Sequence, residues 1–146
     1  MLKIGDAIPD IRLKDQHGKE RSFREFAGKR VVLWYFPKAD TPGCTLEGCG
    51  FRDQHDAYTK KGVVVLGISF DTPAENKAFA EKFHFPFDML CDTERALGLA
   101  LGVATDAKAQ WAKRNTFVIG PTGTLEQIID KVDVKSHPVE LLKSLP

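Results

Sequence analysis

The chain is short of cysteine, with three among 146 residues, and it has no long apolar run. Because no apolar stretch approaches the ~18 residues that cross a bilayer, the sequence predicts no membrane-spanning segment. The first residues, Met1 to Asp6, lack the apolar centre of a signal peptide, so we expect a cytoplasmic location. In that reducing compartment, three cysteines indicate redox chemistry or burial rather than a framework of disulfides.

The chain has no large excess of either charge: it contains 21 Lys and Arg and 20 Asp and Glu, for a net charge of +1. This balance implies no polyanionic partner, and no basic cluster interleaved with aromatic residues indicates nucleic-acid binding. The four histidines and three cysteines lack the paired spacing of zinc ligands, so we expect no metal and no cofactor. The length and the hydrophobic fraction of 42% are typical of one globular domain, which we expect to span residues 1–146.

The most informative stretch joins an apolar run, Val31 to Phe36, to Pro37 and then to Thr41-Pro42-Gly43-Cys44. The apolar run reads as a buried strand. Threonine is a favoured N-cap and proline a favoured first helical residue, so a helix is predicted to start at Thr41. Cys44 then lies in the first turn, where free N–H groups and the helix dipole stabilise a thiolate. This pattern favours a reactive Cys44 over a buried structural cysteine.

Cys49 follows Cys44 by five positions, between Gly48 and Gly50. On an intact helix this spacing corresponds to ~7.5 Å of rise and ~140° of rotation. The two sulfurs would then point apart, so a disulfide requires local unwinding. Each flanking glycine weakens the helix by about 1 kcal/mol relative to alanine, which favours such unwinding. The alternative is that Cys49 faces the core and does not react.

The rest of the chain predicts a mixed sheet. A hairpin turns at Asp15 to Gly18, and Ser22 caps one helical turn over Phe23 to Phe26. A long helix over 42–60 between two buried strands predicts a parallel βαβ unit. Later strands are expected over 63–69, 89–91, 115–119 and 125–131, and helices over 73–84, 94–101 (capped by Thr93) and 138–145 (capped by Ser136).

The motif Pro37-x-x-x-Thr41-x-x-Cys44 resembles the active-site motif of the peroxiredoxins. The extended match, which includes Phe36, Asp40-Thr41-Pro42-Gly43-Cys44-Thr45, Glu47, Cys49 and Phe51-Arg52-Asp53, is similar to the Q-type subfamily (bacterioferritin comigratory protein). The resemblance implies an α/β, thioredoxin-like mixed sheet with helices on both faces and an N-terminal β-hairpin extension. Ala39 departs from the family, which often has an acid there.

The resemblance also implies a function, a thiol-dependent peroxidase for hydrogen peroxide and organic hydroperoxides. Cys44 becomes a sulfenic acid, Cys49 condenses with it to an intramolecular disulfide, and thioredoxin or a similar dithiol protein reduces the product. Arg114, just ahead of the 115–119 strand, matches the family's arginine and would favour the thiolate. Since such a disulfide needs no second subunit, we expect a monomer.

Several roles stay open. Thr41 either caps the helix through its oxygen or donates its hydroxyl to the sulfur or to a peroxide, and Pro37 shields the site from water. Glu47 pairs with Arg114 or Arg52, or simply occupies the favourable helix start. Cys91 is a small buried residue, or else an occasional resolving partner or an oxidation target. Trp111 covers the site or packs in the core or on the surface. Asp88, Asp92 and Asp106 read as solvated loop acids or cap acids.

Competing functions differ in their spacing requirements. A cysteine phosphatase needs Cys-x5-Arg, whereas Arg52 lies eight positions after Cys44. A dithiol oxidoreductase would carry Cys-x-x-Cys, which is absent. The remaining alternative is a non-catalytic peroxide sensor that forms the same disulfide, and turnover with thioredoxin distinguishes it from an enzyme.

Overall fold

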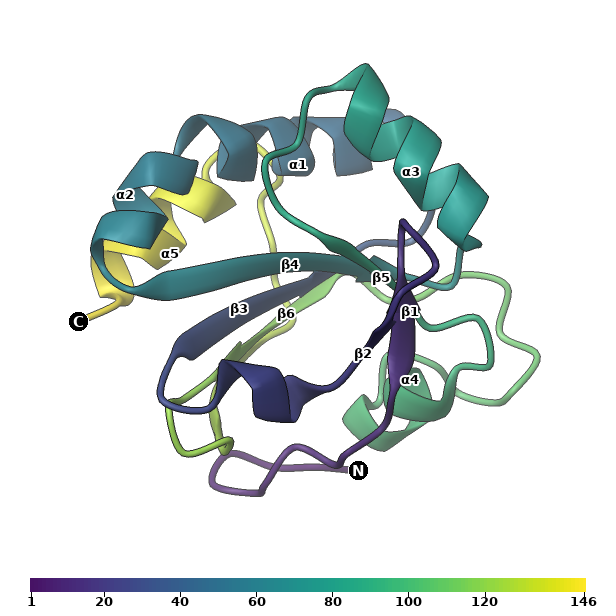
Figure 1. Cartoon of the computed structure of the whole chain (residues 1–146), viewed down its shortest axis with the longest axis horizontal. Helices are drawn as coiled ribbons and strands as arrows, with labels where there is room; N and C mark the ends of the chain where they lie inside the picture. Colours follow the sequence, from purple (N-terminus) through teal and green to yellow (C-terminus); the bar gives the residue numbers. More distant parts are fainter.

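A computed structural model describes all 146 residues, and its framework is a seven-stranded sheet with the order β2-β1-β5-β4-β3-β6-β7 (Figure 1). The central strands β3, β4 and β5 are parallel, and the outer strands are antiparallel to their neighbours. This confirms the predicted mixed sheet. The strands are β1 (Leu13–Asp15), β2 (Glu20–Arg21), β3 (Arg30–Tyr35), β4 (Val63–Ser69), β5 (Met89–Cys91), β6 (Asn115–Ile119) and β7 (Leu125–Ile129).

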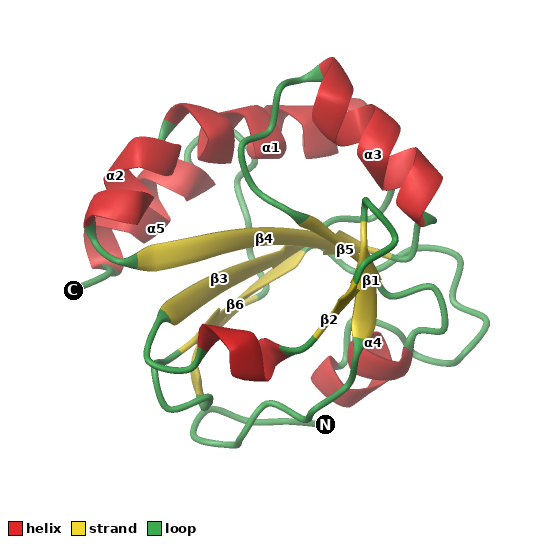
Figure 2. Ribbon diagram, in the orientation of Figure 1, coloured by secondary structure: helices red, strands yellow, loops and turns green.

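Helices cover both faces of the sheet, as predicted (Figure 2). The 3-10 turn η1 and α4 lie on one face, while α1, α2, α3 and α5 lie on the other (Figures 1 and 2). No helix combines the length and the apolar character needed to cross a membrane. The helical elements are η1 (Phe23–Phe26), α1 (Pro42–Asp53), α2 (His55–Lys60), α3 (Pro73–Lys82), α4 (Ala96–Leu101) and α5 (His137–Ser144).

Strand β3 divides the core because its side chains alternate between the two faces. Leu33 and Tyr35 belong to an apolar cluster of 16 buried residues. Trp34 and Phe36 belong to a second cluster of 15 buried residues, which also contains Cys44. The predicted buried strand is therefore central. The chain leaves this strand at Tyr35 and continues through Phe36 toward the start of α1.

The single helix predicted over 42–60 is wrong, because the chain breaks at Gln54 into α1 and α2. Gln54 leaves helical geometry with φ −97° and ψ 3°. After this break, Tyr58 on α2 is buried, and its hydroxyl donates to the carbonyl of Pro138 (2.6 Å). The end of α1 at Asp53 was not evident from local helix propensity, and it is accompanied by a tertiary hydrogen bond from α2 to α5.

The start predicted for the 94–101 helix is also wrong, since α4 begins at Ala96. Arg95 has a left-handed backbone (φ 62°), which interrupts the helix before that point. The carboxylate of Asp92 accepts the amides of Leu97 (3.4 Å) and Gly98 (2.7 Å) and the hydroxyl of Tyr35 (3.1 Å). Asp92 is therefore a buried helix-capping acid, which is the cap alternative that the sequence left open.

The two serine caps predicted from the sequence have different outcomes, and one strand is shorter than predicted. Ser22 does cap η1, in a reciprocal arrangement with Glu25, as predicted. Ser136 precedes α5 but makes no side-chain cap hydrogen bond. Strand β7 ends at Ile129, two residues before the predicted end at Lys131.

Candidate active site

Cys44 lies where the fold brings a strand end to a helix start. The chain leaves β3 at Tyr35, passes through the 36–41 segment and enters α1 at Pro42, so Cys44 is the third residue of the helix. Its side chain is fully buried. In the first turn of a helix the backbone N–H groups point away from the helix and favour a negative charge. This position suits a thiolate.

Arg114 reaches the sulfur from the next strand. It directly precedes β6, and β6 is antiparallel to β3, with Asn115 opposite Tyr35. That register places Arg114 beside the end of β3, and its Nη2 donates to Cys44 Sγ at 3.4 Å. Burial lowers the pKa of Arg114, but its contacts with Glu47 and Cys44 outweigh burial and leave the pKa raised. The guanidinium is thus a permanent positive charge beside the thiol.

Glu47 is the third member of the cluster. Its Oε1 accepts from Arg114 Nη1 at 2.8 Å, whereas Oε2 is buried and has no hydrogen-bond partner. Burial raises the pKa of Glu47 to about 7, although the Arg114 contact opposes the rise. Arg52 does not share in the cluster, because it pairs with Asp53 (3.0 Å) and donates to the carbonyl of Phe83 (2.8 Å). Of the alternatives open for Glu47, the structure selects the pair with Arg114.

Thr41 occupies the N-cap position of α1, but its side chain makes no cap hydrogen bond. Its hydroxyl instead donates to the carbonyl of Lys38 at 2.8 Å. The cap interpretation is therefore wrong, and in this conformation the hydroxyl is directed to its own loop. Pro37 is half-buried at the start of the same loop.

Asp71 is a residue that sequence reasoning missed. Its Oδ2 accepts the amide of Ala39 (2.8 Å) and the hydroxyl of Ser69 (2.7 Å). On the same loop, Asp40 has a left-handed backbone (φ 59°) and pairs with Lys82 on α3 at 2.9 Å. Two contacts from neighbouring elements therefore position the loop that carries Pro37 and Thr41. The sequence could have indicated Asp71, because it is an acid two residues after the end of β4, at the carboxyl edge of the parallel strands.

Cys49 is half-buried in α1, and all three cysteines are free thiols. Helix α1 continues unbroken through both Cys44 and Cys49. Two cysteines five residues apart on an intact helix cannot form a disulfide, which agrees with their free thiols. The flanking glycines also have a packing role. A Cβ on Gly48 would lie 2.4 Å from Phe85 Cζ, and one on Gly50 would lie 2.7 Å from Pro138 Cγ. Close approach of neighbouring side chains thus explains these glycines without reference to unwinding.

Cys91 is buried at the end of β5, where Asn76 Nδ2 donates to its sulfur at 3.4 Å. Burial raises the pKa of the Cys91 thiol to about 11. The thiolate is the reactive form, and burial disfavours it at Cys91, in agreement with the expectation of a small buried residue. Trp111 is 54% exposed, so core packing is not its role.

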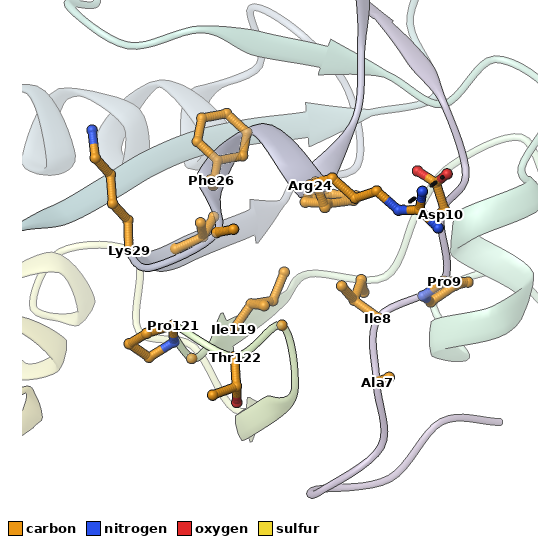
Figure 3. A pocket seen from close by; sticks show the side chains of 15 residues that line it. Ala7, Ile8, Pro9, Asp10, Arg24, Phe26, Lys29, Ile119, Pro121 and Thr122 are labelled. Carbon is orange, nitrogen blue, oxygen red and sulfur yellow. Dashed lines mark ion pairs between the residues drawn. The ribbon is translucent and has the colours of Figure 1, made fainter.

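A cavity of about 430 Å³ lies elsewhere, between η1, the N-terminal segment and the turn that joins β6 to β7 (Figure 3). It opens beside Val31 and Ile119, at the opposite end of β3 from Cys44. Neither Cys44, Arg114 nor Thr41 lines it. The cysteine site is therefore separate from this cavity.

The thioredoxin-like sheet places one buried cysteine at a helix start, beside an arginine. This arrangement is typical of the class of proteins that use a cysteine thiolate as a nucleophile. A model of the AhpC/TSA family matches residues 4–128, so the chain belongs to this family, in its Q-type peroxiredoxin branch. It is 37% identical to "Peroxiredoxin Bcp" of Bacillus subtilis, over 99% of this chain and 95% of that protein. It is 39% identical to "Peroxiredoxin Q, chloroplastic" of Gentiana triflora over 97% of its length, which is 65% of that longer protein.

Among solved structures, the bacterioferritin comigratory protein of Xanthomonas campestris superimposes with a TM-score of 0.88 at 30% identity. The match covers 98% of this chain and 94% of that one, and its description concerns alkyl peroxide reduction by that protein. These comparisons confirm the thioredoxin-like fold and the predicted family. They support a thiol-dependent peroxidase activity for the chain.

Proposed function

We propose that the chain is a single-domain, monomeric cytoplasmic peroxidase that reduces hydrogen peroxide and organic hydroperoxides at Cys44. Cys49 resolves the oxidised form, and thioredoxin or a similar dithiol protein restores the thiols. The observation that carries the proposal is the contact of Arg114 Nη2 with the buried Cys44 sulfur, 3.4 Å apart at the start of α1. The alkyl peroxide activity described for the Xanthomonas campestris protein supports a hydroperoxide substrate.

In the first step, the Cys44 thiolate attacks the terminal oxygen of the hydroperoxide. An S–O bond forms, the O–O bond breaks, and the leaving oxygen departs with the electron pair. The sulfur is oxidised to a sulfenic acid, and the leaving oxygen takes up a proton, so the peroxide is reduced to an alcohol or to water. Arg114 and the first-turn amides of α1 stabilise the charge that develops on the leaving oxygen. Pro37 limits the access of water, and Thr41 becomes a donor to the peroxide if its hydroxyl turns away from Lys38.

Resolution requires a change in α1. Cys49 condenses with the Cys44 sulfenic acid, a disulfide forms, and water leaves. The helix must unwind first, because residues five apart on a helix are beyond disulfide reach. Unwinding exposes Phe51, which is fully buried beside Trp34 (ring centroids 5.4 Å apart). This buried contact favours return to the folded helix once a dithiol protein reduces the disulfide.

The proposal is tested by following peroxide consumption with thioredoxin, thioredoxin reductase and NADPH present. The Cys44→Ser variant should consume no peroxide, because a serine hydroxyl is not ionised at neutral pH. The matched control is Cys91→Ser, at the buried and unreactive thiol, which should turn over at the parental rate. Turnover by Cys44→Ser would refute the assignment, and a single round of oxidation by the parent without recycling would indicate a peroxide sensor.

A further inference from the structure

Two buried acidic side chains and one half-buried cation form a triad at the start of α1. Cys44 and Glu47 are three residues apart, so they lie on the same face of the helix. Both are fully buried, and both contact the same guanidinium, at 3.4 Å from Arg114 Nη2 and 2.8 Å from Arg114 Nη1. One positive charge is therefore shared between two groups that can each become an anion.

The surroundings cannot stabilise two anions at once. Glu47 Oε2 is buried without any hydrogen-bond partner, although an ionised carboxylate normally accepts at both oxygens. A second buried negative charge would have no cation of its own, and such charges are costly away from water. A carboxylic acid at Glu47 removes this cost, which agrees with the rise of its pKa to about 7 through burial.

Other titratable groups near α1 do not take this role. His137 on α5 faces Thr116 (2.9 Å), and burial lowers its pKa to about 4, so it is neutral where Glu47 titrates. On α2, burial raises the pKa of Tyr58, and the His55 ring lies against Phe87. The exposed charges near the helix start are Asp133 and Lys135, on the segment before α5 that approaches Gly43 through Val134, and Lys38 and Asp40, on the loop before α1. The exposed Asp53, Asp56 and Lys60 lie at the far end of α1 and on α2.

We propose that Cys44 and Glu47 share a single proton across Arg114, so that Glu47 is the carboxylic acid whenever Cys44 is the thiolate. The inference rests on the proposed peroxidase function and deepens it. When the O–O bond breaks, Cys44 keeps the terminal OH as a sulfenic acid and Glu47 gives its proton to the leaving oxygen. In this reaction a thiolate, a hydroperoxide and a carboxylic acid are converted to a sulfenic acid, an alcohol and a carboxylate. The net charge of the triad is unchanged, because the carboxylate then pairs with Arg114.

The decisive measurement needs no peroxide. In a Cys49→Ser, Cys91→Ser background, the thiolate of Cys44 is followed by its ultraviolet absorbance from pH 4 to 9, with and without Glu47→Gln. Glutamine keeps the acceptor for Arg114 but cannot become an anion, so the thiolate should form in two coupled steps in the parent and in one step in Glu47→Gln. If Glu47 only positions Arg114 as a carboxylate that stays ionised, the parent also titrates in one step, and that result overturns the proposal.

The second measurement concerns the proton itself. With Glu47→Gln, single-turnover oxidation by hydrogen peroxide should slow by about 10²-fold or more despite the larger thiolate fraction, as for loss of a general acid. An unchanged rate would overturn proton delivery. The control, Glu81→Gln at an exposed position of α3, should change neither quantity. If the parent itself is not oxidised, the peroxidase function fails while the titration still decides whether the two groups are coupled.

The unsubstituted protein provides a check that does not depend on the folding of a variant. Alkylation of Cys44 replaces the thiolate with a neutral thioether, after which Glu47 should release its proton and pair with Arg114. An infrared difference spectrum at pH 8, above the pKa of about 7 that burial gives Glu47, should therefore show loss of a carboxylic-acid band and gain of a carboxylate band. A spectrum without this change would contradict the shared proton.

Discussion

Arg114 donates to the sulfur of Cys44 across 70 residues of sequence, at a distance of 3.4 Å. The contact exists because β3 and β6 pair in a register that sets Asn115 opposite Tyr35. The chain then turns from the end of β3 into α1, while Arg114 stands just before β6. The pairing of β3 with β6 therefore holds a cation beside a nucleophile.

Replacing Arg114 should affect the chemical step more than the fold. Arg114→Ala should reduce the second-order rate of Cys44 oxidation by about 10²–10³, the usual cost of losing one charge-stabilising donor. Arg114→Lys should recover only part of this rate, because an ammonium cannot bridge both Glu47 and the sulfur as a planar guanidinium does. The measurement is stopped-flow oxidation by hydrogen peroxide. Arg12→Ala, at an exposed ion pair with Glu20, is the control, and an equal loss in that variant would contradict the prediction.

Cys49 and Cys91 should behave differently when replaced. Cys49→Ser should undergo one round of oxidation to a Cys44 sulfenic acid and then stop, because the second thiol that forms the disulfide is missing. Cys91→Ser should cycle normally, since burial raises the pKa of that thiol to about 11 and keeps it protonated. Mass spectrometry after one equivalent of peroxide distinguishes a sulfenic acid (one added oxygen) from a disulfide (two lost hydrogens). Normal cycling of Cys49→Ser would transfer the resolving role elsewhere.

Gly50→Ala should destabilise the protein although alanine is the better helix former. The added Cβ would lie 2.7 Å from Pro138 Cγ, and the proline ring at the start of α5 cannot turn aside. Overpacking should lower the free energy of unfolding by about 1–3 kcal/mol, which outweighs the ~1 kcal/mol gained in helix propensity. Urea denaturation provides the measurement. Ala78→Gly, at an exposed site of α3, calibrates propensity alone, and a stabilised Gly50→Ala would show that α5 moves freely.

His137 should make the folded state less stable in acid. Burial lowers its pKa from 6.5 to about 4, so below pH 6.5 the unfolded chain binds the proton more readily. Stability from this residue is present above pH 6.5 and declines as the pH falls toward 4, by at most about 3 kcal/mol. Urea midpoints between pH 7 and 4 should therefore fall less steeply in His137→Asn than in the parent. The exposed His17→Asn is the control, and identical slopes in all three proteins would contradict the assignment.

Glu47 should act in the opposite direction. Burial raises its pKa from 4.5 to about 7, so its favourable contribution is present below pH 4.5 and is lost as the pH rises toward 7. In Glu47→Gln, stability should therefore increase relative to the parent as the pH rises from 5 to 8. The same urea series provides the measurement. A difference between the two proteins that does not depend on pH would show that Glu47 is ionised throughout.

Local patterns were sufficient for most of the framework. The alternation around Val31 to Phe36, the β-branched run at 63–69 and the Thr72-Pro73 start of α3 each depend on neighbours within one turn or one strand. Two of the misplaced boundaries, at Gln54 and Arg95, depend instead on residues far away in the sequence. Tyr58 bonds to Pro138 and Asp92 bonds to Tyr35, contacts that join residues 80 and 57 positions apart. No pattern within a short window contains such partners.

The sequence by itself determined the place of Cys44, because strand, proline and helix start follow one another within a few residues whose conformational preferences are intrinsic. It also indicated Arg114 through the family motif. Only the tertiary structure decided that Glu47 shares Arg114 with Cys44, that Thr41 bonds to Lys38 and that Asp71 holds the loop. Propensity depends on each residue and its neighbours along the chain. Charge and hydrogen bonding depend on burial and on which strands pair, and these are settled only when the sheet has formed.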